Sequence, residues 1–285
     1  MNTQTARESR YVTVARLAYQ MAQRNWSLYS HPKSPKRFTQ PQLVACVLLA
    51  FYLNKSYRDA EEWLLATDQV CAVLELKTVP DHSTLSRMAK KLSQKAIRAL
   101  IDSLLAELEV EEEVVAGDST SFRLSQASAY YQTRRGKSYK EWVKGAYAVG
   151  IHSKLIVGCA SSEGSKPDFG FLRPLKRQVK RWGKRVGDKR VWLFLGDKGF
   201  DARGVHRLDL IPPIRRNGKL VNPKRKARAD LVSAARLDGL MGQRWQVEGV
   251  NSVIKRKFGD TIRARSLTLQ LREPLLKALV YNIHV

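Results

Sequence analysis

Cysteine is scarce in this sequence, and no apolar run approaches the roughly 18 residues that a membrane span needs. The three cysteines (Cys46, Cys71 and Cys159) are widely spaced, and each lies among apolar residues. We predict buried thiols of a reducing compartment, because the cysteines form no zinc-binding pattern with the five histidines. The first residues also lack the apolar core of a secretion signal. These absences favour a cytoplasmic protein without a membrane partner.

Acidic residues are also few, since 26 Asp and Glu stand against 51 Lys and Arg, for a net charge of +25. Residues 1–112 carry 15 basic and 12 acidic residues, whereas residues 113–285 carry 36 and 14. This asymmetry indicates a polyanionic partner, because lysine or arginine bound to a phosphate releases condensed counterions. We predict double-stranded DNA as the partner and association with the nucleoid. RNA remains an alternative.

Residues 1–112 are predicted to form a helical N-terminal domain that binds DNA ends or dimerises. The expected helices cover residues 9–29, 39–53, 57–65, 81–92 and 95–110. Residues 81–92 have the size and polarity of the recognition helix of a helix-turn-helix, with Arg87 and Lys90 as candidate DNA contacts. A helical bundle without DNA contacts is the alternative, and the low charge of this segment favours it.

Residues 113–285 are predicted to form an α/β domain, a mixed sheet flanked by helices. The expected strands cover residues 113–118, 143–151, 154–161, 191–195 and 209–215. The expected helices cover residues 168–182, 201–208, 229–258 with a break near 239–242, and 267–283. Asp118 and Asp197 each follow a short apolar run, so both are expected at strand ends, where sites of such sheets gather.

A third acid, Glu248, lies in a basic segment that is predicted to be helical. At about 100° per residue, Arg244 and Lys255 fall within about 40° of Glu248, apart from an apolar stripe that begins at Val247. Taken singly, each aspartate can be explained as the cap of a turn. Arg244 and Glu248 can likewise be explained as a simple i,i+4 ion pair. Together with the basic charge, the three carboxylates indicate a magnesium site for phosphodiester cleavage.

These residues resemble the signatures of DDE transposases of prokaryotic insertion sequences, which have an RNase H-like core. Asp197-Lys-Gly-Phe200 resembles the family's D-x-G-[YF] motif, and Arg244-x3-Glu248-x6-Lys255 resembles its Y-x2-R-x3-E-x6-K signature. Met241 stands where the family's tyrosine would fall. The resemblance covers residues 113–285 well and residues 39–92 loosely.

The resemblance implies that Asp118, Asp197 and Glu248 bind two Mg²⁺ ions, for which Mn²⁺ can substitute. The enzyme would cut DNA at the ends of an element, and the freed 3′-hydroxyl would attack target DNA within at least a homodimer. Trp245 resembles a tryptophan that some relatives stack on DNA bases, with a core aromatic as the alternative. Cationic DNA contacts are expected at Arg244, Lys255, Arg256 and Lys257, and around a basic loop over residues 216–228 at Arg215, Arg216, Lys224, Arg225 and Lys226.

Two functional alternatives remain open at this point. An RNase H-like nuclease would cut without joining strands, and a domesticated transposase would only bind DNA. The intact set of three acids argues against the second alternative. The helix predicted at residues 168–182 offers a further basic face for phosphates, and contacts of this kind position DNA without reading its sequence.

Overall fold

The computed structural model describes residues 8–125, 142–164, 166–202, 205–206, 209–215 and 217–285. The chain divides into two compact units. The first comprises residues 1–104 and 279–284, and the second comprises residues 105–278 and 285. Among the described residues, no helix has the length and apolar character that crossing a membrane would take.

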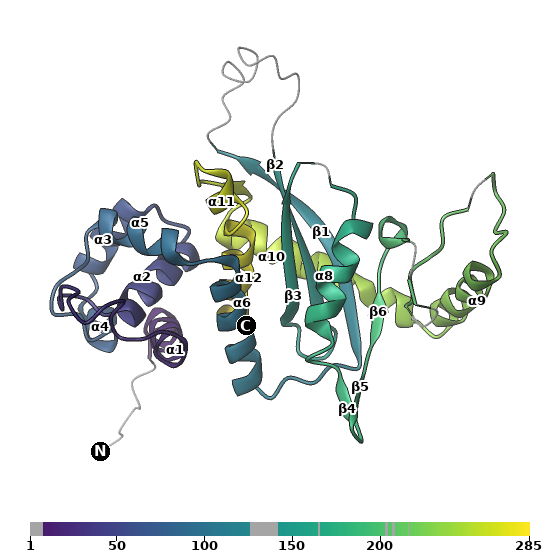
Figure 1. The fold of residues 1–285 in the computed structure, drawn as a ribbon, viewed down its shortest axis with the longest axis horizontal. Helices are drawn as coiled ribbons and strands as arrows, with labels where there is room; N and C mark the ends of the chain where they lie inside the picture. Colours follow the sequence, from purple (N-terminus) through teal and green to yellow (C-terminus); the bar gives the residue numbers. More distant parts are fainter. Residues whose placement is uncertain (1–7, 126–141, 165, 203–204, 207–208, 216) are drawn as a thin grey trace, which may run out of the picture. The chain divides into compact units, whose positions relative to one another are not determined.

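The first unit is helical, as predicted (Figure 1). Its helices are α1 (Arg10–Asn25), α2 (Gln40–Tyr52), α3 (Tyr57–Leu65), α4 (Asp68–Val73), α5 (His82–Lys91) and α6 (Gln94–Glu107), of which α6 continues into the second unit. Thr39 caps α2, because its side chain accepts a hydrogen bond from the Gln42 backbone and its own backbone donates to the Gln42 side chain. The short helix α4 was not predicted.

Helix α2 forms the centre of this unit, because it is apolar on nearly every side and almost all of its residues are buried. Cys46, on this helix, is buried as predicted, and so is Cys159 in the second unit. Cys71 is only partly buried, which corrects the prediction for that thiol. All three cysteines are free.

The second unit contains a mixed sheet flanked by helices, which confirms the predicted fold class. The strands of this sheet are β1 (Val114–Leu124), β2 (Trp142–Gly150), β3 (Ile156–Glu163), β6 (Leu193–Leu195) and β7 (Thr261–Ile262). Their order is β3-β2-β1-β6, and β7 also pairs with β1. The pairs β1–β2 and β2–β3 are antiparallel, whereas β6 and β7 run parallel to β1. A separate hairpin joins β4 (Lys184–Val186) to β5 (Lys189–Val191).

Helices cover both faces of the main sheet (Figure 1). Helix α8 (Phe169–Val179) packs against β2 and β3. The packing is close at Gly158, where an added Cβ atom would lie 3.4 Å from the Leu175 carbonyl oxygen. Helix α10 (Trp245–Phe258) contacts β1 and β2 from the opposite face. On that face, the Tyr147 hydroxyl donates to the Pro274 carbonyl at the start of α12 (Glu273–His284).

A basic helix, α9 (Pro223–Leu237), precedes α10 in the chain. It is followed by the 3-10 turn η2 (Leu240–Arg244). Gly239 lies between them with φ of 74°, a left-handed conformation that favours glycine. The predicted break near residues 239–242 is therefore confirmed. A one-turn helix, α11 (Leu267–Gln270), precedes α12.

Several predicted elements are wrong in detail. Asp118 lies in the middle of β1 and not at its end, because pairing with β2 continues through Arg123. The strand predicted at residues 209–215 is reduced to one bridge between Leu195 and Leu210. The described part of residues 201–208 contains no helix, and the basic loop predicted to reach residue 228 ends at the start of α9. The β4–β5 hairpin was not predicted.

Candidate active site

Asp118 is presented by the central strand of the sheet. Neighbouring residues on a strand point to opposite faces, so Asp118 and Ser119 face different helices. The Asn251 side-chain amide, on α10, donates to Asp118 Oδ2 at 3.0 Å. On the other face, the Ser119 hydroxyl donates to Asp168, the residue before α8, at 2.5 Å. Two neighbouring residues of β1 thus make polar contacts on opposite faces of the sheet.

Asp197 follows the parallel strand β6 and lies close to Asp118 through strand register. Ala116 pairs with Leu195, so Asp118 and Asp197 each lie two residues beyond this pair. The Asp197 side chain caps the 3-10 turn η1 (Lys198–Phe200) and accepts a hydrogen bond from the Gly199 backbone at 2.8 Å. The strand-end position predicted for Asp197 is confirmed.

Gly199 is glycine because of crowding and not because of an unusual backbone conformation. A Cβ atom at this position would lie 2.8 Å from Asp168 Oδ2 and 3.0 Å from Asp197 Oδ1. Both distances are shorter than ordinary van der Waals contact. The glycine of the D-x-G-F segment therefore lets two carboxylates approach the same turn.

Glu248 is carried by the first turn of α10. Val247, Val250 and Ile254 are buried on one side of this helix, and the Glu248 side chain remains half exposed. Arg244 is ion-paired with Glu248 at 2.6 Å, as the i,i+4 spacing predicted. The helix thus anchors through its apolar stripe while its charged side faces outward.

The charges of these residues influence one another. Burial raises the pKa of Asp118 above its usual range. A hydrogen bond from the Ser119 backbone and the positive charge of Arg244 oppose the shift, whereas the negative charges of Asp197 and Glu248 add to it. The other two predicted acids and the predicted arginine are therefore within electrostatic reach of Asp118.

The residues present are chemically suited to a hydrated Mg²⁺ ion. Their donors are oxygens, and their like charges would repel one another without a cation. The Asn251 side-chain oxygen is buried and has no hydrogen-bond partner in the described part of the chain, so it can accept a hydrogen bond from a water. Within the same residues, no three His, Cys, Asp or Glu side chains already surround a common point. Strand register brings Asp118 and Asp197 together, and Glu248 is engaged by Arg244.

Two polar residues of this region escaped the sequence analysis. Asn251 interrupts the apolar stripe of α10 one turn after Glu248, and a polar residue at a core position was the available signal. Asp168 gave no such signal, because its partner Ser119 lies 49 residues away in the chain. Asp168 also binds the Lys144 ammonium group on β2 at 2.5 Å, which balances its charge.

The remaining predicted DNA contacts on α10 are accessible to different degrees. Trp245 is 65% exposed, so the alternative that it is a core aromatic is wrong. Arg256 is exposed, and Lys257 is partly exposed. The Lys255 ammonium group lies 6.0 Å from the centre of the Phe122 ring, which is a cation-π distance. All four residues belong to the helix that carries Glu248.

The basic segment around α9 is only partly available to a partner. Lys224 and Lys226 are exposed on the helix, and Arg215 is exposed before it. Arg225 instead contacts the buried Asp201 carboxylate at 3.2 Å, and the buried Arg228 also pairs with Asp201. Arg216 lies outside the described residues. Arg225 and Arg228 thus fix α9 through their ion pairs with Asp201.

The basic face predicted around residues 168–182 is likewise interrupted by internal ion pairs. Lys176 on α8 binds the buried Asp209 carboxylate at 2.6 Å, and Lys184 on β4 pairs with Glu113. Arg173, Arg177 and Lys180 are exposed. The number of cations that can meet phosphates on this helix is therefore smaller than the sequence suggested.

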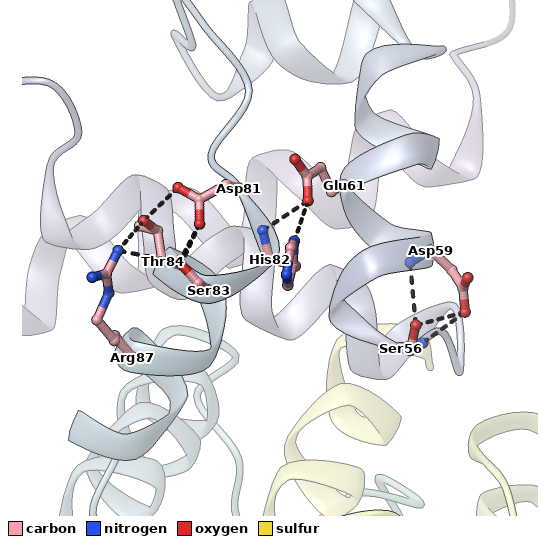
Figure 2. Close-up of polar contacts among 8 residues, drawn as sticks. All are labelled: Ser56, Asp59, Glu61, Asp81, His82, Ser83, Thr84 and Arg87. Carbon is pink, nitrogen blue, oxygen red and sulfur yellow. Dashed lines mark hydrogen bonds and ion pairs between the residues drawn. The ribbon is translucent and has the colours of Figure 1, made fainter.

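In the first unit, hydrogen bonds organise the N-terminus of α5 (Figure 2). Asp81 accepts hydrogen bonds from Ser83 and Thr84, and these bonds hold the pKa of Asp81 well below its usual range. Arg87 is exposed and folds back to donate to the Thr84 hydroxyl at 3.0 Å. Lys90 is exposed one turn further along the helix.

This end of α5 is also tied to α3. The Glu61 carboxylate accepts hydrogen bonds from the His82 backbone at 2.8 Å and from its ring at 2.9 Å, and these bonds lower the pKa of Glu61 (Figure 2). Asp59 and Ser56 form a capping box at the start of α3. The exposed side of α5 therefore starts from a well-fixed turn.

Comparison with known proteins gives one informative match. Residues 109–283 match the family model described as a transposase DDE domain. The matched region is more than half of the chain and contains all three predicted acids. No curated protein matches the chain.

Proposed function

The chain belongs to the family of DDE-domain transposases, and from this premise we propose that it cuts DNA at the ends of an insertion sequence and joins the freed ends to target DNA. Members of this family are DNA-handling enzymes that generally use divalent metal ions. The observation that carries the proposal is geometric, since strand register brings Asp118 and Asp197 together within the matched residues. Helix α10, which carries Glu248, is hydrogen-bonded to Asp118 through Asn251.

Asp118, Asp197 and Glu248 would hold two Mg²⁺ ions, for which Mn²⁺ could substitute. Such ions would lower the barrier by activating the attacking oxygen and stabilising the leaving one. The support for this arrangement is physical, because three carboxylates near one another repel, and a divalent cation relieves that repulsion. The buried position of Asp118 increases the benefit, because charges interact more strongly away from water.

The cationic residues would bind the DNA backbone on either side of the cut. Arg244 lies one turn before Glu248 and Lys255 two turns after it on the same helical face, and a guanidinium can make two parallel hydrogen bonds to a phosphate. The exposed Trp245 ring, at the start of α10, could stack on an unpaired base at the cut end. Lys224, Lys226, Arg215, Arg256 and Lys257 would extend this phosphate-binding surface.

Arg87 and Lys90 of α5 are proposed to contact DNA at the element ends, with residues 1–112 as the region that recognises those ends or dimerises. Joining two ends requires that both are held at once, so the active complex would contain at least two copies of the chain. We expect it to act on DNA of the nucleoid.

The test is cleavage of DNA that contains the genomic flanks of the gene, in the presence of Mg²⁺ or Mn²⁺. Asp118→Ala and Glu248→Ala should each abolish strand cleavage, while binding of the same DNA in a gel-shift assay changes little. Asp188→Ala, which removes an exposed acid from the β4–β5 turn, is the matched control and should cut like the original chain. Cleavage that survives in either site variant would refute the proposed chemistry.

A second measurement separates transposition from simple nuclease activity. DNA with a pre-cut 3′ end should be joined to a target duplex, and the joined product should be absent with Asp118→Ala. Efficient cutting with no joined product would favour an RNase H-like nuclease. Stronger binding to single-stranded RNA than to duplex DNA would favour the RNA-binding alternative.

A further inference from the structure

Asn251 has an unusual position for a buried polar residue. It lies on the side of α10 that packs on the sheet, is 7% exposed, and follows Glu248 by three residues. Its amide group donates to Asp118 Oδ2 at 3.0 Å, so it links the helix that carries one acid to the strand that carries another. An apolar residue would suit the packing at this position, since Val247, Val250 and Ile254 around it are all buried.

The other half of the same amide is unsatisfied. The Asn251 side-chain oxygen is buried and has no hydrogen-bond partner within the described residues. A buried acceptor in this state is destabilising, because it has lost its hydrogen bonds to water without gaining one in the protein. The hydrogen bond to the Asp118 carboxylate fixes which end of the amide faces that acid, because only the NH₂ end can donate to it.

The unpaired oxygen must lie near the carboxylate site. The oxygen and nitrogen of one amide group are about 2.2 Å apart by covalent geometry, so the Asn251 oxygen lies within about 5 Å of Asp118 Oδ2. Mg²⁺ keeps several water ligands when it is bound by few carboxylates, and such waters donate hydrogen bonds. An acceptor beside the carboxylates is therefore well placed for one of these waters.

We propose that Asn251 is a positioning residue of the carboxylate site, whose amide nitrogen orients Asp118 and whose amide oxygen accepts a hydrogen bond from a water bound to the divalent cation. The inference rests on the proposed function, since it assumes that the cation binds at Asp118. It assigns a role to a residue outside the three acids. It also explains why a polar side chain interrupts the apolar side of α10.

The experiment measures Mn²⁺ binding to the full-length chain without DNA, by the loss of the electron paramagnetic resonance signal of the free ion. Asn251→Ala should weaken binding by about 10- to 100-fold, the usual effect of removing a partner that orients a metal ligand. Ser252→Ala, at the exposed neighbouring position on the same helix, is the matched control and should bind like the original chain. Asn251→Leu should weaken binding equally while it fills the space that alanine leaves empty.

Thermal melting provides a second readout that a purely structural role would not move. Excess Mn²⁺ should raise the melting temperature of the original chain, because the cation binds the folded state. At the same Mn²⁺ concentration, the Asn251 variants should gain less, and cleavage should recover as Mn²⁺ is increased. A folded Asn251→Leu variant with unchanged Mn²⁺ affinity would overturn the inference.

The comparison with Asp118→Ala separates the inference from the proposed function. If Asp118→Ala loses Mn²⁺ binding while the Asn251 variants retain it, only the role of Asn251 is refuted. If the original chain binds no Mn²⁺, or if Asp118→Ala binds it equally well, then the proposed metal site itself fails, and the inference fails with it.

Discussion

Replacing Gly199 with alanine tests whether the close approach of two carboxylates at this turn matters for cleavage. The added Cβ would lie 2.8 Å from Asp168 Oδ2 and 3.0 Å from Asp197 Oδ1, whereas ordinary contact begins at 3.4 Å. The turn or the carboxylates must therefore move by about 0.4–0.6 Å. Asp168 is held by Ser119 and by Lys144, each at 2.5 Å, so the turn that carries Asp197 should take most of the displacement.

The expected effect on activity follows from this displacement. A misplacement of about 1 Å at a reacting centre can cost about 100-fold in rate, so a shift of about half that size should cost about tenfold. The assay is single-turnover cleavage at saturating Mg²⁺, with thermal melting to verify that the variant folds. Melting should change little, because Gly199 itself is only partly buried.

Gly249→Ala is the matched control, because Gly249 adjoins Glu248 and its Cβ would meet only the Trp245 ring, at 3.9 Å. Alanine in the interior of α10 should raise the free energy of unfolding by about 0.5–1 kcal/mol, since glycine loses more backbone entropy on folding. Cleavage should be unchanged. If Gly199→Ala cuts within twofold of the original chain, then the crowding at this turn does not position Asp197, and the reasoning is wrong.

Two further predictions concern buried charges. Burial lowers the pKa of Lys277 from 10.5 to about 8. Between these two pH values the unfolded chain binds more protons than the folded chain, so the free energy of unfolding should rise with pH, by about 3 kcal/mol at most. Urea unfolding at pH 7.5 and 10.5 should show this gain in the original chain relative to Lys277→Met, and an equal pH response in both would contradict it. Arg228→Ala should destabilise the chain by about 3 kcal/mol, because among the described residues it leaves the buried Asp201 carboxylate with the partly exposed Arg225 as its remaining ionic partner. Arg225→Ala should cost less in the same unfolding assay, and a larger loss for Arg225→Ala would refute this ranking.

Local sequence patterns predicted the elements whose formation depends on nearby residues. Thr39 and Gln42 form a capping box because both partners lie within one turn, so the start of α2 could be read directly. The break before α10 was predictable for the same reason, since Gly239 adopts a left-handed conformation that other residues avoid. Apolar runs likewise located β2, β3 and β6. The predictions failed where an apolar run was not a strand, as at residues 209–215, where one bridge to Leu195 is all that forms.

Asp197 and Glu248 were identified by their motifs and Asp118 by the apolar run before it, and the family match contains all three. Sequence alone could also predict that Arg244 pairs with Glu248, because the two lie one helical turn apart. It placed Asp118 at the end of its strand, however, because the apolar run stops there. Pairing with β2 carries the strand through Arg123, since backbone hydrogen bonds to a neighbouring strand do not require apolar side chains.

By itself, the sequence determined the helical class of residues 1–112, the α/β class and basic charge of residues 113–285, and which acids are proposed for the candidate site. Only the tertiary structure decided which polar groups support those acids. Asn251 reaches Asp118 across 133 residues of chain, and Asp168 reaches Ser119 across 49. The tertiary structure also shows that Arg225 and Arg228 bind Asp201, which no count of basic residues could reveal. The physical reason is that helical and capping interactions join residues within about four positions, whereas sheet register and helix packing bring distant residues together.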